Sequence, residues 1–308
     1  MAEIALHVMT PEERALRRKR ITRETLTTVF FHVACIFIAF WMVLPFYWSV
    51  LSSFRPKDEI SSFYISWFPN VLTLENYNRV FSEIDFFRLL RNSLFTSLTG
   101  LFTNLFFGTL AAYSFAKLRF KGHKIVFNIM LISMMIPGVI TLIPTFLVIV
   151  KFPLVGGNNI IGQGGNGFYD SHAAVILPGA IGVYGIFFMR QFFVSLSDEF
   201  GESARVDGAS EIRIFLQIYV PMVLPGLLTL GIFTFQSGWN NFMWPNIVLI
   251  SEHVKLLTQA FGRFRSPQLT EFGPLMALST LMILPIIIIF IFAQKYFIKG
   301  ISVGGIKG

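Results

Sequence analysis

The sequence SLSDEFGESARVDGASEIRIFLQIYVP, from Ser195 to Pro221, separates two apolar stretches that are each long enough to cross a membrane. It places acids, bases, small residues and one central glycine between short apolar runs. The rest of the chain is strongly apolar, with 54% hydrophobic and only 14% charged residues, whereas a soluble domain usually carries about 25% charged residues. We therefore interpret the segment as an ordered connection within an all-α membrane protein.

Six apolar stretches meet the length of about 20 residues that a membrane-spanning helix needs. They are Thr27–Val50, Leu90–Ala116, Ile125–Val150, His172–Met189, Met222–Ile250 and Pro274–Ala293. The first stretch lacks the small-residue pattern of a cleaved signal peptide, so we expect it to remain in the protein. The prediction is a six-span domain over residues 27–298, between a basic N-terminal segment (residues 1–26) and a C-terminal tail (residues 299–308).

The distribution of lysine and arginine predicts the orientation of these spans. Basic residues are more frequent on the side of the alternation that holds both termini, the segment KLRFKGHK (Lys117–Lys124) and Ser195–Pro221. Basic loops face the cytoplasm, so both termini and Ser195–Pro221 are predicted to be cytoplasmic. This distribution also explains the net charge of +8, and the loops are too short to form a surface for nucleic acid.

Two loops on the opposite side have readable patterns. The sequence LTLENYNRVF (Leu72–Phe81) predicts a short amphipathic helix within the first loop. The glycine- and asparagine-rich stretch from Lys151 to Ser171 has no periodicity and is predicted to be an irregular loop.

Several kinds of enzymatic site are disfavoured. A literal G-x-G-x-x-G occurs at Gly162, Gly164 and Gly167, but the strand and helix that a dinucleotide site requires are not predicted around it. The chain contains no G-x-x-x-x-G-K-[ST] sequence, its five histidines are scattered, and its single cysteine is Cys35. We expect no catalytic site, metal or cofactor in this chain.

The predicted spans contain Asp, Glu, Lys and Arg only at or beyond their ends. Ion-coupled carriers usually place such groups within the membrane to bind and relay the coupling ion. The pattern therefore favours a transporter that takes its energy from elsewhere and a neutral, hydrogen-bonding solute.

The local pattern of Ser195–Pro221 predicts two helices joined by a glycine turn. Ser197 and Ser210 are expected to cap the two helices, and Gly208 to form the turn after a first helix that ends near Val206. Such a pair could insert into a cleft of a partner protein, or it could lie on the membrane surface. The pattern alone leaves both alternatives open.

The same segment resembles the EAA loop of ABC importer permeases. The resemblance is carried by Glu202-Ser203-Ala204, Asp207-Gly208-Ala209, and then Ile218 and Pro221, with small departures at Ser203 and Val220. The sequences LRNSL (Leu90–Leu94), ILPG (Ile176–Gly179), GWNNFMWP (Gly238–Pro245) and GGIKG (Gly304–Gly308) resemble the carbohydrate, maltose-transporter-like branch. The resemblance covers nearly the whole chain.

This resemblance implies an assembly in a bacterial or archaeal cytoplasmic membrane. The permease would pair with a homologous second permease as a heterodimer, receive sugar from an extracytoplasmic solute-binding protein, and couple to two ATPase subunits that bind ATP and Mg²⁺. Residues implied to couple to the ATPase are Glu202, Ser203, Ala204, Asp207, Gly208 and Ala209. Among them, Glu202 would supply a polar contact, while Ala204 and Gly208 would permit close approach.

The fifth predicted span contains the polar and aromatic residues expected to contact a sugar. Candidates for the substrate path are Gln236, Trp239, Asn240 and Asn241, with Asn104 and Tyr113 on the second span. Hydrogen bonding between helices is the competing explanation, and in this branch the sugar site could lie mostly on the partner permease. Two other functions remain open: an ABC permease for a charged solute such as a sugar phosphate or amino acid, and a self-contained secondary carrier or channel.

Overall fold

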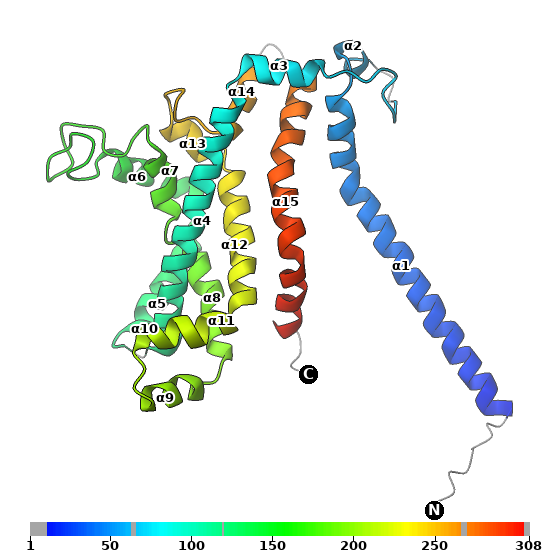
Figure 1. The fold of residues 1–308 in the computed structure, drawn as a ribbon, viewed down its shortest axis with the longest axis horizontal. Coiled ribbons are helices and arrows are strands. Elements are labelled where there is room, and N and C mark those ends of the chain that lie inside the picture. The colour runs from blue at the N-terminus through cyan, green and yellow to red at the C-terminus, as the bar shows by residue number, and fades with distance from the viewer. Residues whose placement is uncertain (1–10, 63–65, 119, 266–269, 305–308) are drawn as a thin grey trace, which may run out of the picture.

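The computed structural model describes residues 11–62, 66–118, 120–265 and 270–304, and in this part the regular structure is helical (Figure 1). Four helical segments are long and apolar enough to cross a membrane: Glu24–Ser53, Phe86–Lys117, His172–Ser195 and Phe272–Phe292. Two bent helix pairs bring the number to six if each pair is one span. The predicted all-α membrane fold is confirmed.

The third and fifth predicted spans are bent rather than continuous. Helices α5 (His123–Ser133) and α6 (Gly138–Val150) meet at 108° across a break that ends at Pro137. Because proline restricts the residue before it and lacks a backbone N–H, helix α5 cannot continue straight through this position. In the fifth prediction, Met222–Ile250, the span is α12 (Leu224–Trp239), which meets the preceding helical segment Glu211–Met222 at 81°. The predicted range also includes a turn and the short helix α13 (Met243–Val248).

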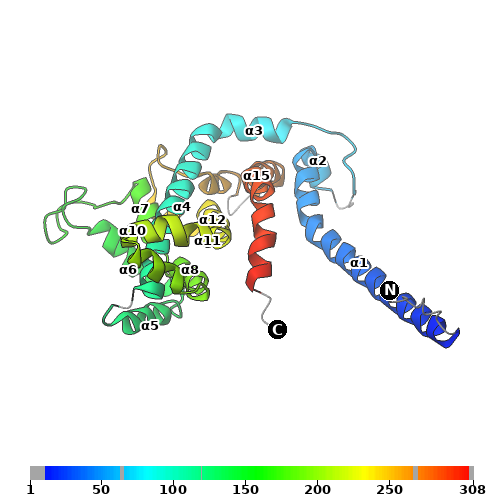
Figure 2. The ribbon, with the colours of Figure 1, turned by 60° about the horizontal axis from the view of Figure 1, so that its bottom comes forward.

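The centre of the bundle is formed by α4 (Phe86–Lys117), α8 (Val183–Ser195) and α12, which pack against one another along their lengths (Figures 1 and 2). Small residues allow this close packing. A side chain at Gly226 of α12 would lie 2.9 Å from the Phe192 ring of α8. Helix α4 contacts both α8 and α12.

Two helices complete the membrane region on the other side of α12. Helix α15 (Phe272–Gly304) packs against α12, and α1 (Pro11–Ser53) contacts α15 but leans away from it along most of its length (Figure 1). The apolar window of α1 has no buried residues. Its exposed phenylalanine, isoleucine and valine side chains suit an apolar environment such as lipid.

The connections at the α3 end of the bundle follow the sequence predictions. The predicted amphipathic helix is α3 (Glu75–Glu83), and Arg79 on it forms an ion pair of 2.7 Å with Glu271, just before α15. The predicted irregular loop after α6 has left-handed backbone conformations at Gly162, Gly164 and Gly167. These glycines form turns rather than a nucleotide-binding strand–turn–helix unit.

Candidate functional site

The segment from residue 195 to residue 221, here called the polar loop, projects from the end of the bundle opposite α3 (Figure 1). It contains α9 (Glu199–Val206), a turn, and α10 (Glu211–Ile214). Gly208 has a φ of +80°, the left-handed conformation that glycine adopts without strain, and the Ser210 side chain accepts a hydrogen bond from Arg213 N at 3.4 Å. The predicted helix–glycine–helix arrangement is confirmed.

The two faces of α9 differ in exposure. Glu202, Ser203 and Asp207 are exposed, and the carboxylate of Glu202 makes no hydrogen bond within the described residues. The Val206 side chain is 88% exposed, although valine usually avoids water. By contrast, Ala204 is buried against the bundle. Helix α9 is thus held by its small-residue face and presents an acidic and apolar face outward.

A lysine at the end of α4 holds the start of the polar loop. Lys117 Nζ donates to the carbonyl oxygen of Leu196 at 2.8 Å and to Asp198 Oδ1 at 2.6 Å. The same ammonium lies 5.3 Å from the centre of the Tyr219 ring. These contacts join α4 to both ends of the polar loop.

A second connection joins α4 to the middle of the polar loop. Tyr113 Oη donates to Glu211 Oε2 at 2.9 Å, and Arg205 Nε donates to Glu211 Oε1 at 2.5 Å. The hydrogen bond to Glu211 raises the pKa of Arg205, so the guanidinium stays charged. Glu211 therefore connects a span residue, Tyr113, with a residue of α9, Arg205.

Aromatic packing surrounds this connection. Tyr113 contacts Phe193, Phe215 and Tyr219, with ring centres 5.1–5.7 Å apart. Phe215 and Tyr219 delimit a π-helical turn, a conformation often found at functional sites. The helical segment that contains this turn meets α12 at 81°, so the polar loop continues into α12 through a buried bend.

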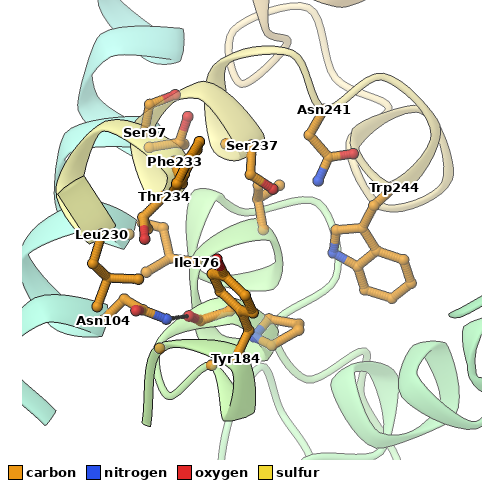
Figure 3. Close-up of a pocket in the computed structure, with 18 residues that line it drawn as sticks. Ser97, Asn104, Ile176, Tyr184, Leu230, Phe233, Thr234, Ser237, Asn241 and Trp244 are labelled. Carbon is orange, nitrogen blue, oxygen red and sulfur yellow. Dashed lines mark hydrogen bonds between the residues drawn. The ribbon is translucent and has the colours of Figure 1, made fainter. Parts of the chain in front are cut away.

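A cavity of about 640 Å³ lies between α4, α8 and α12 (Figure 3). Thr234, Ser237 and Asn241 are three of its polar lining residues, and Tyr184, Phe233 and Trp244 supply aromatic surface. No Asp, Glu, Lys, Arg or His is among the residues that line it. Its size and its mixture of apolar and a few polar groups are typical of a small-molecule site.

Asn104 forms part of the cavity wall. Its Nδ2 donates to the carbonyl oxygen of Gly179 at 3.0 Å, while its Oδ1 is buried without a partner in the described part of the chain. A side chain at Gly182 would come within 2.5 Å of Asn104, and one at Gly185 within 2.7 Å. These glycines let α4 and α8 approach around the Asn104 amide.

Of the six residues predicted for the substrate path, two line the cavity and four lie elsewhere. Asn104 and Asn241 line the cavity, whereas Gln236 and Asn240 are exposed and outside its lining. Trp239 is buried and donates from Nε1 to the carbonyl oxygen of Met282 at 3.0 Å, which ties α12 to α15. The sixth residue, Tyr113, binds the polar loop instead.

Most lining residues were not predicted from the sequence, among them Ser97, Tyr184, Phe233 and Thr234. Phe233 and Ser237 are four residues apart on α12, and Asn241 follows four residues later, so a helical projection would have grouped them. The residues between them, such as Gln236 and Trp239, point to other faces. Nothing in the sequence around Tyr184 indicates that α8 contributes to the cavity.

Among the described residues, no group of three or more His, Cys, Asp or Glu side chains is arranged to hold a metal ion. The predicted GGIKG tail lies mostly outside the described residues, as do residues 1–10 of the basic N-terminal segment.

Comparison with known proteins relates most of the chain to membrane transport proteins. Residues 104–303 match the model of the family described as "Binding-protein-dependent transport system inner membrane component". The chain is 34% identical to the arabinooligosaccharides transport system permease protein AraQ of Halalkalibacterium halodurans, over 88% of this chain and 94% of that protein. It is 28% identical to the lactose transport system permease protein LacG of Rhizobium radiobacter, over 87% and 92% of the two chains.

The fold is also similar to that of a solved transporter. A chain in the crystal structure of a bacterial ABC transporter involved in the import of the acidic polysaccharide alginate superposes with a TM-score of 0.71. The match covers 94% of this chain and 99% of that chain at 23% sequence identity. At this identity the likeness supports the fold alone.

Proposed function

The chain belongs to the family of inner-membrane components of binding-protein-dependent transport systems, and we propose that it forms half of the translocation path of an ATP-driven sugar importer. The observation that carries the coupling part of this proposal is the polar loop. It exposes one face of α9 and is fixed to α4 through Lys117 and Tyr113. A loop built in this way can transmit force from a partner to a membrane helix.

The exposed face of α9 is the proposed contact with a separate ATPase subunit. Glu202, Ser203 and Asp207 supply its polar groups, and Val206 supplies an apolar contact. Ala204 packs toward the bundle, so its proposed role is to seat α9 and not to touch the partner. Gly208 and Ala209 form the turn that sets the direction of α10.

The family suggests the remaining parts of the proposed assembly. A binding-protein-dependent system includes a solute-binding protein, which would deliver the solute at the α3 end. We propose that a homologous permease supplies the other half of the path and that two ATPase subunits, which hold ATP and Mg²⁺, bind the polar loops. In this arrangement both termini of the chain are cytoplasmic.

A sugar is the proposed solute because AraQ and LacG are named for arabinooligosaccharide and lactose transport. The cavity fits this assignment, since it offers hydroxyl, amide and aromatic groups and no charged side chain. A charged solute would lack a counter-charge there, which disfavours a sugar phosphate or an amino acid.

The test is reconstitution in proteoliposomes. Proteoliposomes that contain the chain and its copurified partners are expected to accumulate sugar only when the binding protein and hydrolysable ATP are present. They should not accumulate it with a non-hydrolysable ATP analogue. Accumulation by this chain alone would contradict the proposal and support a self-contained carrier.

A further inference from the structure

We propose that the cavity between α4, α8 and α12 is a binding subsite on this chain for one neutral glycosyl unit of the transported sugar. This inference rests on the proposed sugar import and adds two statements to it. The first is that this chain contacts the sugar directly, with Thr234, Ser237 and Asn241 as the hydrogen-bonding groups. The second is that the subsite rejects a glycosyl unit that carries a carboxylate.

Helix α12 and the turn after it carry free hydrogen-bonding groups. The side chains of Thr234, Ser237 and Asn241 line the cavity and make no hydrogen bond to any described residue. Figure 3 shows Ser237 and Asn241 directed into the space between Tyr184 and Trp244. The hydroxyl groups of Thr234 and Ser237 and the amide of Asn241 can each donate or accept a hydrogen bond. Each can therefore pair with a sugar hydroxyl, whether that hydroxyl donates or accepts.

Aromatic surface lies on two sides of the same space. Tyr184 is 47% exposed and stacks on Phe188 with ring centres 5.9 Å apart, which fixes its orientation. Trp244 is fixed by a hydrogen bond of 2.9 Å from Nε1 to the carbonyl oxygen of Ala174. Two held rings provide flat apolar surface for the C–H face of a sugar ring without a cost in side-chain entropy on binding.

On the α4 side of the cavity the polar side-chain atoms are bonded or buried: Thr96 Oγ1 donates to backbone carbonyls of α4, and Ser97 Oγ is buried. Asn104 lines the cavity, but its Nδ2 is committed to Gly179 and its Oδ1 is enclosed beside Gly185. It therefore acts as a positioning residue that holds α4 against α8. The groups left for a ligand are those on α12, its C-terminal turn and α8.

The charge of the cavity lining determines which sugars it accepts. The cavity lining contains no cationic side chain, and the one indole N–H nearby already has a partner. Moving a carboxylate from water into such a site without a cation is strongly unfavourable. A hydroxyl-bearing neutral ring can instead exchange its water contacts for Thr234, Ser237 and Asn241.

The first step of the test separates this inference from the proposed function. Uptake by the complete wild-type complex is measured with arabinotriose, lactose, diacetylchitobiose and trigalacturonate. Accumulation of at least one neutral sugar is expected. If none of the four is taken up, the proposed sugar import fails, and this inference fails with it.

The second step measures occupancy of the subsite by cysteine protection. Cys35 is the single cysteine of the chain, so Cys35→Ser gives a cysteine-free background. Ser237→Cys places a thiol in the cavity, and Asn246→Cys places one on the exposed side of α13, where the native amide bonds only to Phe242 O. The transported neutral sugar is expected to slow N-ethylmaleimide labelling of Ser237→Cys at least threefold and to leave Asn246→Cys unchanged.

Two results would overturn the inference while the proposed function stands. One is protection of Ser237→Cys by trigalacturonate, which would mean that the subsite accepts a carboxylate. The other is equal labelling of Ser237→Cys with and without the transported sugar, which would place the sugar on the partner permease alone.

The third step uses substitutions that remove one polar group each. Ser237→Ala and Asn241→Ala are each expected to raise the sugar concentration for half-maximal uptake roughly two- to tenfold, the effect of one lost hydrogen bond. Asn246→Ala is the matched control and should leave this concentration unchanged. Unchanged values for both cavity variants, in complexes that retain their partner subunits, would contradict the assignment.

Discussion

Two segments of α4 differ in the hydrogen bonding of their polar side chains. At the end next to the polar loop, Tyr113 and Lys117 are joined to Glu211, Asp198 and a backbone carbonyl by hydrogen bonds of 2.6–2.9 Å. In the segment before it, the Ser97 hydroxyl, the Asn104 carbonyl oxygen and the Thr109 hydroxyl are buried without partners in the described part of the chain. The end is assembled as a mechanical joint, and the segment from Ser97 to Thr109 keeps unsatisfied groups and close glycine contacts, which suit a region that rearranges.

One helix can thus both transmit force and line a solute path, because different segments of it carry the different chemistry that each task needs. A joint that transmits force should hold one geometry, which charge-assisted hydrogen bonds and packed aromatic rings provide. A path for a solute should instead exchange partners during each cycle. The joint is tested first and the cavity region second.

The largest effect is expected at the turn of the polar loop. Gly208→Asp should reduce uptake to background, a loss of at least roughly a hundredfold, while the protein still inserts into the membrane. Aspartate is disfavoured by about 1–2 kcal/mol at the φ of +80°, and it adds a charge where the ATPase is proposed to bind. ATP-dependent uptake and copurification of the ATPase measure the two consequences.

Gly122 offers a matched control for this substitution. It has a φ of +84°, and a side chain there, as at Gly208, would meet nothing within 4 Å. Gly122→Asp therefore introduces the same backbone strain outside the polar loop and is expected to retain most uptake. Equal losses for the two variants would show that strain, and not partner binding, makes Gly208 necessary.

The next effect is expected at the joint itself. Tyr113→Phe keeps the aromatic ring among Phe193, Phe215 and Tyr219 but removes the hydrogen bond to Glu211. A hydrogen bond to a charged group contributes about 1.5–3 kcal/mol, so we expect uptake per ATP hydrolysed to fall roughly tenfold or more. Copurification of the ATPase should be unchanged, because the exposed face of α9 is intact.

Ser114→Ala is the control for the loss of a hydroxyl from the same turn of α4. Ser114 Oγ bonds only to Leu110 O within the helix, so its removal should leave the ratio of uptake to hydrolysis unchanged. A Tyr113→Phe variant that transports and hydrolyses like the wild type would remove Tyr113 from the coupling path.

The helix–glycine–helix arrangement of the polar loop could be predicted because it depends on local chemistry. Ser210 caps a helix, and Gly208 permits a left-handed turn, whatever lies around them. The role of Tyr113 could not be predicted in this way. Its partner Glu211 is 98 residues away in sequence, and only the packing of α4 against the polar loop brings them together.

The cavity was only partly predictable for the same reason. The stretch Gln236–Asn241 was identified by composition, but composition does not show that α12 ends at Trp239 or which helix face is turned toward α8. Trp239 illustrates the ambiguity, since its ring packs in the core and its N–H binds Met282 O. Tyr184 enters the site from a different helix and carries no local signal.

A third prediction tests the close packing beside the cavity. Gly185→Ala would place a methyl group 2.7 Å from Asn104 Oδ1 and 3.4 Å from Leu230 Cδ2, so α4 and α8 would have to separate. Overpacking of this kind costs about 1–3 kcal/mol, and we expect a corresponding decrease in the free energy of unfolding in detergent.

Gly231→Ala is the comparison for Gly185→Ala. The nearest atoms to its methyl group would be 3.5 Å away, an ordinary contact, so this variant should be neutral or slightly more stable. If Gly185→Ala is equally well tolerated, the close approach around Asn104 is adjustable and the cavity wall is not fixed.

The last prediction compares two serines that lie one turn apart on α4 and are both 3% exposed, Ser93 and Ser97, and the smallest effect is expected at Ser97. Ser93 Oγ accepts a hydrogen bond of 2.7 Å from Leu257 N, whereas Ser97 Oγ has no partner in the described residues. Ser93→Ala should lower the free energy of unfolding by about 1–3 kcal/mol, because it leaves a buried N–H unpaired. Ser97→Ala should change it by less than about 0.5 kcal/mol or raise it, since no bond is lost. Thermal unfolding of the two variants in one detergent compares them directly. A Ser97→Ala variant as destabilised as Ser93→Ala would mean that Ser97 has a partner in the folded protein, and the contrast between the two segments of α4 would no longer hold at this position.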